Sequence, residues 1–195
     1  MVITLITVFA AAVLTHNIAL TYLLGMCPFI SLSRSLRTAS GMGFAVIFVV
    51  TLTTLINWPI YNLILVPTGT ELIYYIVFII VIAAGVQLVE MIMERFFPPL
   101  QAAFGIFLPL ITVNCTVLAV SLFMVIREYD YLTSVIFAFG SAVGWIIAIV
   151  IVAAINEKLK LIADIPKGMR GPGIIMVTAG IIALAFLGFA GMVNI

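Results

Sequence analysis

The run AAFGIFLPLITVNCTVLAVSLFMV, at residues 102–125, contains no charged side chain and is long enough to cross a lipid bilayer as a helix. A membrane core of about 30 Å is crossed by roughly 20 apolar residues in helical form. Because lipid offers no hydrogen-bond partners, the backbone of such a run must satisfy itself within a helix. The run therefore predicts a transmembrane helix, and it carries two residues that are unusual in one, Pro109 and Cys115.

Five further runs have the same character, and they lie at residues 2–24, 41–66, 72–93, 132–155 and 173–193. Of the 195 residues, 66% are hydrophobic and 8% are charged, and the mean hydropathy is +1.42, which excludes an ordinary soluble domain. The first run lacks the basic start and the cleavage site of a signal peptide. We therefore expect an all-α integral membrane protein, a single six-helix membrane domain over residues 1–195.

The basic residues predict an orientation in the membrane. Among the loops, Arg127 alone lies in an even-numbered one, and seven of the eight basic residues lie in odd-numbered ones: Arg34, Arg37, Arg95, Lys158, Lys160, Lys167 and Arg170. Lysine and arginine concentrate in cytoplasmic loops of membrane proteins. We expect the odd-numbered loops in the cytoplasm and both termini outside.

Three runs precede the middle of the chain and three follow it. Because each half has an odd number of helices, the second half crosses the membrane in the opposite orientation to the first. This predicts inverted repeats at about 1–97 and 98–195. The first helix of each half contains a glycine and a proline that interrupt helices, and these are Gly25 with Pro28 and Gly105 with Pro109. Paired interruptions of this kind indicate an intramembrane site.

Cys27 and Cys115 are the only cysteines. A cysteine in an apolar helix is most often a small buried hydrophobic residue, and two thiols can also form a disulfide or bind metal. An iron–sulfur cluster usually needs four thiolates, so a second chain would have to supply the other two. Cys27 falls at the end of its run and Cys115 near the middle of its own, so the first helix must break early to bring them to one depth. Asn114 could donate to a sulfur or satisfy a broken backbone.

A few other polar residues lie inside the runs. Glu90 is a candidate for a cation path, since carboxylates within membranes are usually functional, although it could equally lie at the interface or pair with an arginine. His16 could bind a ligand or simply bond a neighbouring helix. The aromatic residues near the outer ends predict an interfacial belt rather than a site, and these are Trp58, Tyr61, Tyr74, Tyr75, Tyr129 and Tyr131. No motif for nucleotides or nucleic acid is present.

Four stretches carry a resemblance to a known family: LGMC at 24–27, ERFFPPL at 94–100, FGIFLPLITVNC at 104–115, and RG at 170–171 followed by TAG at 178–180. They resemble the membrane subunits shared by two redox complexes. One is the bacterial Na+-translocating NADH:quinone reductase, through its E subunit, and the other is the Rnf ferredoxin:NAD+ oxidoreductase, through its A subunit. The resemblance extends over essentially the whole chain.

The resemblance implies a function that composition alone does not reach. It implies a 2Fe–2S cluster in the membrane, held by Cys27 and Cys115 together with two cysteines of a homologous sister subunit of opposite topology. It implies electron transfer across the bilayer, coupled to export of Na+ or H+, with Glu90 at an acidic position suggested for cation handling. Other subunits would carry flavins and iron–sulfur clusters, and the chain would act as a part of this multisubunit oxidoreductase rather than alone. The stretches at 25–28, 105–109 and Asn114 would surround the cluster.

Two choices remain open at this point. The stretches FFPP at 96–99, FMV at 123–125 and GSAVGW at 140–145 are similar to the E subunit of the quinone reductase, and they favour it, whereas CPF at 27–29 is closer to the Rnf A subunit. Outside this family, an inverted-repeat secondary transporter would use His16, Glu90 and the interrupted helices as a substrate site. A purely structural membrane subunit would tolerate changes at both cysteines.

Overall fold

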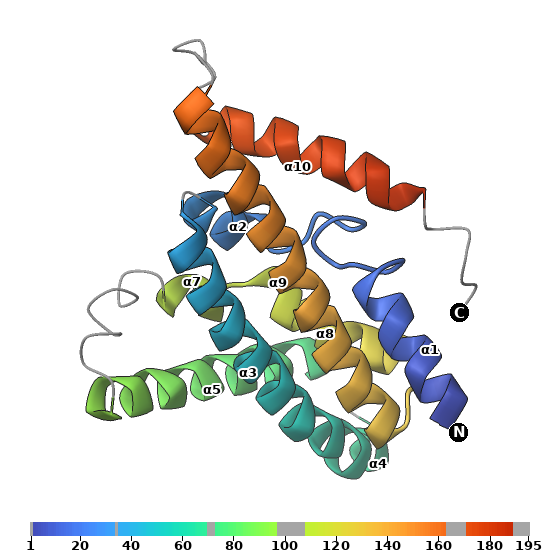
Figure 1. Ribbon diagram of the computed structural model, residues 1–195. Coiled ribbons are helices and arrows are strands. Elements are labelled where there is room, and N and C mark those ends of the chain that lie inside the picture. The colour runs from blue at the N-terminus through green and yellow to red at the C-terminus, as the bar shows by residue number, and fades with distance from the viewer. Residues whose placement is uncertain (1, 34, 70–72, 97–107, 163–170, 189–195) are drawn as a thin grey trace. The chain divides into compact units, whose positions relative to one another are not determined.

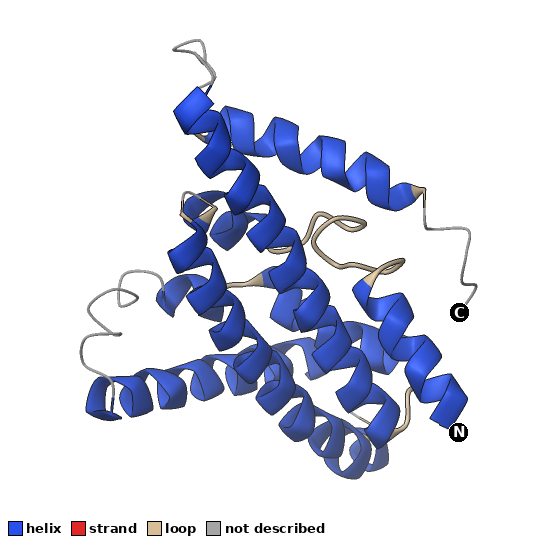
Figure 2. Cartoon of the chain, viewed as in Figure 1, coloured by secondary structure: helices blue, strands red, loops and turns tan. Residues whose placement is uncertain are grey.

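The computed structural model describes residues 2–33, 35–69, 73–96, 108–162 and 171–188, and every regular element in these ranges is helical (Figures 1 and 2). In chain order the elements are α1 (Val2–Val13), α2 (Met26–Leu32), α3 (Leu36–Ile60), the π-helix η1 (Tyr61–Leu65), α4 (Val66–Thr68), α5 (Tyr74–Phe96), α7 (Leu108–Thr112), α8 (Cys115–Ile126), α9 (Tyr131–Ile162) and α10 (Pro172–Leu187). The predicted all-α class is confirmed.

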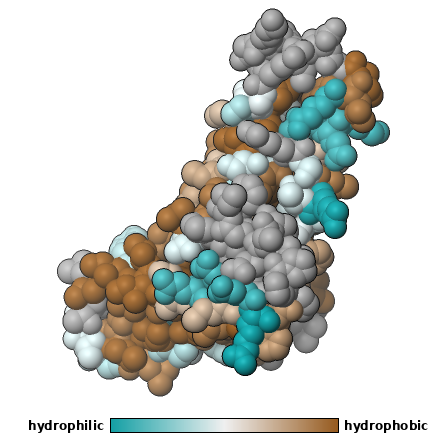
Figure 3. All heavy atoms as spheres, turned by 90° about the vertical axis from the view of Figure 1, so that its left-hand side faces the viewer, coloured by the Kyte–Doolittle hydropathy of each residue, from teal (hydrophilic) through white to brown (hydrophobic). Residues whose placement is uncertain are grey.

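Three helical stretches among the described residues are long and apolar enough to cross a membrane: Leu36–Thr68, Tyr74–Phe96 and Tyr131–Ile162. They correspond to the predicted runs at 41–66, 72–93 and 132–155. Two shorter apolar stretches that are largely helical, Leu110–Ile126 and Pro172–Leu187, fall in the fourth and sixth runs. Apolar side chains are also prominent among the described residues on the face in Figure 3, as expected for a protein whose outer surface meets lipid.

The first predicted helix is shorter than its hydropathy indicates. We expected one helix over residues 2–24, but α1 ends at Val13 and residues 14–25 form turns (Figure 2). The Thr15 hydroxyl donates to the Ala11 carbonyl at 3.1 Å, and the Asn17 amide donates to the Val13 carbonyl at 3.2 Å. The His16 amide bonds the Ala11 carbonyl, five residues back, at 2.7 Å, so the regular pairing with the carbonyl four residues back ends near Val13.

The fourth predicted helix is interrupted as well. Helix α7 ends at Thr112 and α8 begins at Cys115, with Val113 and Asn114 between them. The helices that begin the two predicted repeats are therefore both broken. Gly105 lies outside the described residues, and so does the repeat boundary near residue 97, so the inverted repeat remains a prediction.

The chain forms two compact units. Residues 1–45 and 140–195 make the first unit, and residues 46–139 make the second. Each unit takes residues from both halves of the sequence. Cys27 lies in the first unit and Cys115 in the second, so the surroundings of each cysteine are built separately.

In the first unit, α1 packs closely against α9 because α9 carries glycines on the contacting face. A Cβ atom at Gly140 would lie 3.1 Å from the Cβ of Ala12 and 3.2 Å from the Phe9 carbonyl oxygen. A Cβ at Gly144 would lie 3.0 Å from the Val13 carbonyl oxygen. Small residues allow such close approach of helices where the hydrophobic effect is absent.

Candidate functional site

Cys27 lies in the first turn of α2, directly after the break. Gly25 precedes this helix with φ of 78°, a left-handed conformation that glycine adopts without steric cost, and its carbonyl accepts a 3.3 Å hydrogen bond from the Phe29 amide. Pro28 is buried and does not interrupt α2, because the first turn of a helix lacks amide partners in any case. The Cys27 side chain is exposed on this chain. Gly25 therefore starts the helix that presents the thiol.

Cys115 begins α8, and the residue before it caps that helix. The Asn114 side-chain oxygen accepts from the Thr116 amide at 3.1 Å, and its backbone is extended, with φ of −72° and ψ of 110°. Asparagine is among the best residues at this position because its side chain satisfies an amide that the helix leaves open. Asn114 is 3% exposed and its Nδ2 atom has no hydrogen-bond partner among the described residues. Asn114 is the residue that fixes where α8 begins.

The two cysteines thus share a local setting. Each lies in the first turn of a helix, and each helix follows a break in an apolar stretch. The open amide groups and the dipole at the start of a helix favour negative charge nearby, and a metal-bound thiolate carries such charge. Neither cysteine forms a disulfide. The two free thiols therefore share a setting that favours negative charge.

No group of three or more histidine, cysteine, aspartate or glutamate side chains comes together among the described residues. A 2Fe–2S cluster usually takes four ligands, and this chain has two cysteines. A cluster of that kind at these cysteines would therefore need two further ligands from outside this chain. Pro109 lies within α7, one turn before the break.

Glu90 lies in α5 and is half-buried, whereas Glu94 and Arg95, in the next turn, are exposed. This places a half-buried carboxylate in the last two turns of a largely apolar span. His16 belongs to the turns after α1, where the Tyr22 hydroxyl lies 3.4 Å from its Nδ1 atom and the two rings stack at 6.5 Å. The contact of His16 with Tyr22 is thus a local one.

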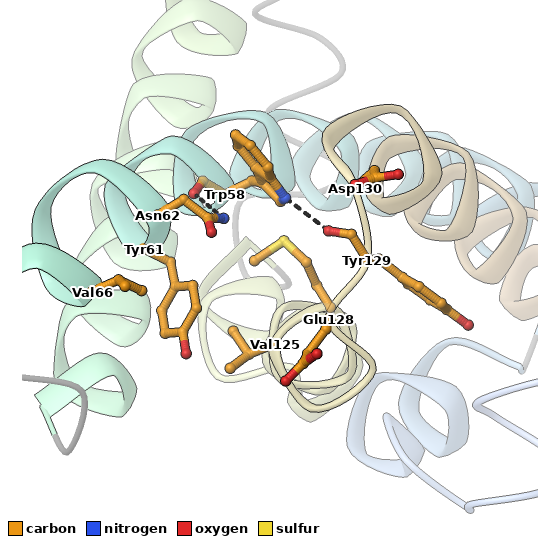
Figure 4. A pocket seen from close by; sticks show the side chains of 9 residues that line it. Trp58, Tyr61, Asn62, Val66, Val125, Glu128, Tyr129 and Asp130 are labelled. Carbon is orange, nitrogen blue, oxygen red and sulfur yellow. Dashed lines mark hydrogen bonds between the residues drawn. The ribbon is translucent and has the colours of Figure 1, made fainter.

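The aromatic residues expected at the outer interface come together in the second unit. Trp58 packs edge-to-face on Tyr131 at 5.2 Å, and Tyr74 contacts Tyr75 at 4.2 Å and Tyr61 at 6.1 Å between ring centroids. The Trp58 indole donates to the Tyr129 carbonyl at 2.9 Å, as Figure 4 shows. This hydrogen bond joins α3 to the loop between α8 and α9.

A cavity of about 440 Å³ opens beside this bond, lined by Trp58, Tyr61, Asn62, Val66, Met124, Val125, Glu128, Tyr129 and Asp130 (Figure 4). The guanidinium carbon of Arg127 lies 5.8 to 6.0 Å from the ring centroids of three aromatic residues, Phe123, Tyr129 and Phe137. Met124 and Val125 lie at the opposite end of α8 from Cys115. With a rise of 1.5 Å per residue, they are about 14 Å from Cys115 along the helix axis. The cavity is therefore separate from the surroundings of that cysteine.

Sequence reasoning missed two features. Pro59 inside α3 is followed by the π-helix η1, and a proline within an apolar run was the signal for such a distortion. Asn156 directly follows the predicted run at 132–155, where a loop is expected, but it is buried in α9 and its amide donates to the Ser33 carbonyl at 2.9 Å. A polar residue at the end of a long apolar run is a weak signal, because such residues usually face water.

Comparison with known proteins agrees with the resemblance found in the motifs. Residues 5–193 match the model of a family described as Rnf-Nqr subunit, membrane protein. The E subunit of the Na(+)-translocating NADH-quinone reductase of Serratia proteamaculans (strain 568) is 48% identical over 193 residues, which cover 96% of this chain and 97% of that protein. The protein of the same name from Proteus mirabilis (strain HI4320) is 46% identical with the same coverage. The chain therefore belongs to the Rnf-Nqr family of multi-pass membrane subunits.

Proposed function

We propose that this chain is the E-type membrane subunit of a Na+-translocating NADH:quinone reductase and that it carries electrons across the membrane. The relatives named above bear that name and match almost the full length of the chain, which favours this complex over the Rnf complex. As one subunit of a multisubunit oxidoreductase it acts only with its partners. Its observed spans and apolar surface suit a protein embedded in the inner membrane.

The observation that carries the proposal is that each cysteine begins or nearly begins a helix after a break in an apolar stretch. Cys27 and Cys115 would hold one side of a 2Fe–2S cluster, and a homologous sister subunit of opposite topology would supply the other two thiolates. When bound, the cluster accepts and passes on single electrons. A carrier inside a core of about 30 Å divides one long electron transfer into two shorter ones.

The residues around the cysteines have definable tasks in this proposal. Asn114 fixes the start of α8 and therefore the position of the Cys115 sulfur. Gly25 lets the chain turn sharply into α2, so that Cys27 follows the turn at once. Because Cys27 is exposed on this chain, the sister subunit would have to cover its thiolate in the complex. A dry setting would then make the charge of a reduced site act strongly on nearby groups.

The orientation and the transported ion belong to the proposal too. The odd-numbered loops, which carry most of the basic residues, would face the cytoplasm, and both termini would lie outside. The relatives' name specifies Na+ translocation. Glu90 is the half-buried carboxylate of α5 and therefore a candidate for handling the cation inside the membrane.

Low-temperature EPR of the complex, purified without oxygen, tests the role of the cysteines. Cys115→Ala should abolish a 2Fe–2S signal that the wild type shows, because the cluster loses one of four ligands. Val113→Ala is the matched control, since Val113 is two residues away and 74% exposed. An unchanged spectrum in Cys115→Ala would contradict the proposal and favour the transporter alternative.

Glu90→Gln tests the cation path separately. We expect the Na+ concentration at half-maximal transport to rise by about tenfold, which corresponds to roughly 1.4 kcal/mol of lost binding, with the EPR signal unchanged. Glu94→Gln, four residues on and exposed, is the control and should behave as the wild type. Equal Na+ dependence in both variants would remove Glu90 from the path.

A further inference from the structure

Residues 14–33 form the segment that carries Cys27, and two hydrogen bonds hold this segment to α9. The side chain of a buried asparagine makes each of these attachments. Asn17 lies on the segment itself and bonds the backbone of α9. Asn156 lies on α9 and bonds the backbone at the end of α2. All four partners belong to the first compact unit.

Asn17 is 0% exposed, and both its side-chain nitrogen and its oxygen are used. Its Nδ2 atom donates to the Gly144 carbonyl at 2.8 Å and to the Val13 carbonyl at 3.2 Å, and its Oδ1 atom accepts from the Ala19 amide at 3.1 Å. One amide group therefore joins the end of α1, the turn that follows it, and the backbone of α9. A buried amide in such a position is costly to leave unpaired, so it specifies one arrangement.

Asn156 is 2% exposed, and its Nδ2 atom donates to the carbonyl of Ser33, the residue that ends α2, at 2.9 Å. The next residue, Glu157, accepts a 3.3 Å hydrogen bond from the amide of Leu36, where α3 begins. Gly144 and Asn156 are about twelve residues apart on α9, or about 18 Å along its axis. One attachment therefore lies before Cys27 in the chain, at Asn17, and the other lies after it, at Ser33.

Little regular structure lies between these attachments. Residues 14–25 are turns, with Leu23 at φ of 53° and Gly25 at φ of 78°, and α2 has seven residues. Phe29 packs edge-to-face on Trp145 at 6.3 Å, which adds an apolar contact to α9. The segment contains only one short helix, and α2 also contacts α10. The position of the Cys27 thiol along α9 therefore depends on where the segment is attached to α9, and the contact with α10 supports it from another helix of the same unit.

We infer that Asn17 and Asn156 are positioning residues for Cys27, and that together they set the place of its thiol along α9. The inference rests on the proposed role of Cys27 as a cluster ligand. Neither asparagine would touch the cluster itself. Each acts through the backbone, Asn17 from the turn before α2 and Asn156 from the residue that ends it.

The test uses the whole complex with Asn17→Asp and, separately, Asn156→Asp. Each substitution keeps the volume and one oxygen of the side chain but removes the N–H groups that donate to the carbonyls. Asn62→Asp is the matched control, because Asn62 is exposed and its amide donates locally, to the Trp58 carbonyl at 3.2 Å. Two quantities are measured: the EPR g values with the midpoint potential of the cluster, and the rate at which N-ethylmaleimide alkylates Cys27 relative to Cys115 after the iron is removed with chelator.

We expect the Cys27 to Cys115 alkylation ratio to rise by about tenfold in both variants, since one lost buried hydrogen bond shifts a local equilibrium by about that factor or more. The g values and midpoint potential should shift in the same two variants and stay unchanged in Asn62→Asp. A general loosening of the fold would raise both thiol rates and leave the ratio constant, which would overturn the inference, as would a ratio equal to that of the wild type.

Gly144→Ala keeps the inference testable if an aspartate variant does not assemble. A Cβ at Gly144 would lie 3.1 Å from the Asn17 Nδ2 atom and 3.0 Å from the Val13 carbonyl oxygen, so it disturbs the same attachment without removing a polar group. We expect the same rise in the alkylation ratio, and an unchanged ratio would count against positioning. A wild-type complex without a 2Fe–2S signal would overturn the proposed function, whereas the thiol ratio would still decide the role of the asparagines.

Discussion

The segments that carry Cys27 and Cys115 both place a thiol at the start of a helix, but they do so through different hydrogen bonds. Near Cys27 the break spans residues 14–25, and side chains bond across to α9, 127 residues away in sequence for Asn17 and Gly144. Near Cys115 the break is two residues long, and Asn114 caps the following helix through an amide two residues ahead. A thiol at the start of a helix can thus be placed by distant partners or by one local cap. Changes to the distant partners should affect only the first cysteine, and changes to the cap only the second.

Loss of either thiol should have the largest effect on the complex. It is also the one change to which both regions should respond alike. Cys27→Ala should abolish cluster absorbance and Na+ uptake by membrane vesicles together, because a cluster that lacks a ligand cannot carry electrons to drive the ion. Na+ uptake that survives without the cluster would break the link between electron flow and transport. Met26→Ala, the half-buried residue before it, is the control and should retain both.

The sequence predicts the long spans well, and it predicts the breaks only in part. Hydropathy identified the stretches that became α3, α5 and α9, because an uninterrupted apolar run in lipid has only one way to pair its backbone. Hydropathy also extended the first helix to residue 24. The three polar residues Thr15, His16 and Asn17 lower the mean hydropathy of that apolar run too little to mark a break. The end of α1 depends on how the backbone and the Asn17 side chain pair with the last carbonyls of the helix, and hydropathy does not register this.

The candidate site shows the same division. Glycine and proline marked both interrupted helices. The asparagine beside Cys115 was identified as a residue that could donate to a sulfur or satisfy broken backbone, and its side-chain oxygen accepts from the Thr116 amide. The partner of Asn17 on α9 was not predictable, because its choice depends on how α1 and α9 pack. Close packing required Gly144 at the contact, and a single sequence does not say which helix faces a given glycine.

The packing of α1 on α9 supplies the next prediction, with a smaller effect confined to the first region. Gly140→Ala should lower the free energy of unfolding by about 1 to 3 kcal/mol, because the added Cβ meets the Phe9 carbonyl oxygen, which cannot move without its helix. Thermal unfolding of the purified complex measures this change. Gly180→Ala in α10 is the control, since a Cβ there meets nothing within 4 Å and alanine favours helix by about 1 kcal/mol. Equal losses in both variants would mean that α1 is not held closely to α9.

The smallest effect should come from the local cap. Asn114→Ala removes the bond to the Thr116 amide, which costs about 1 kcal/mol for an N-cap, and it should raise the alkylation rate of Cys115 while that of Cys27 stays constant. Asn114→Ser should lose less, because serine also accepts from the amide of the capped turn. A rise in Cys27 reactivity in Asn114→Ala would contradict the independence of the two regions. Constant Cys115 reactivity would mean instead that α7 and the rest of α8 hold this thiol without the cap. The opposite pattern is expected for Asn17→Asp, so the two variants together separate placement by a local cap from placement by attachment to α9.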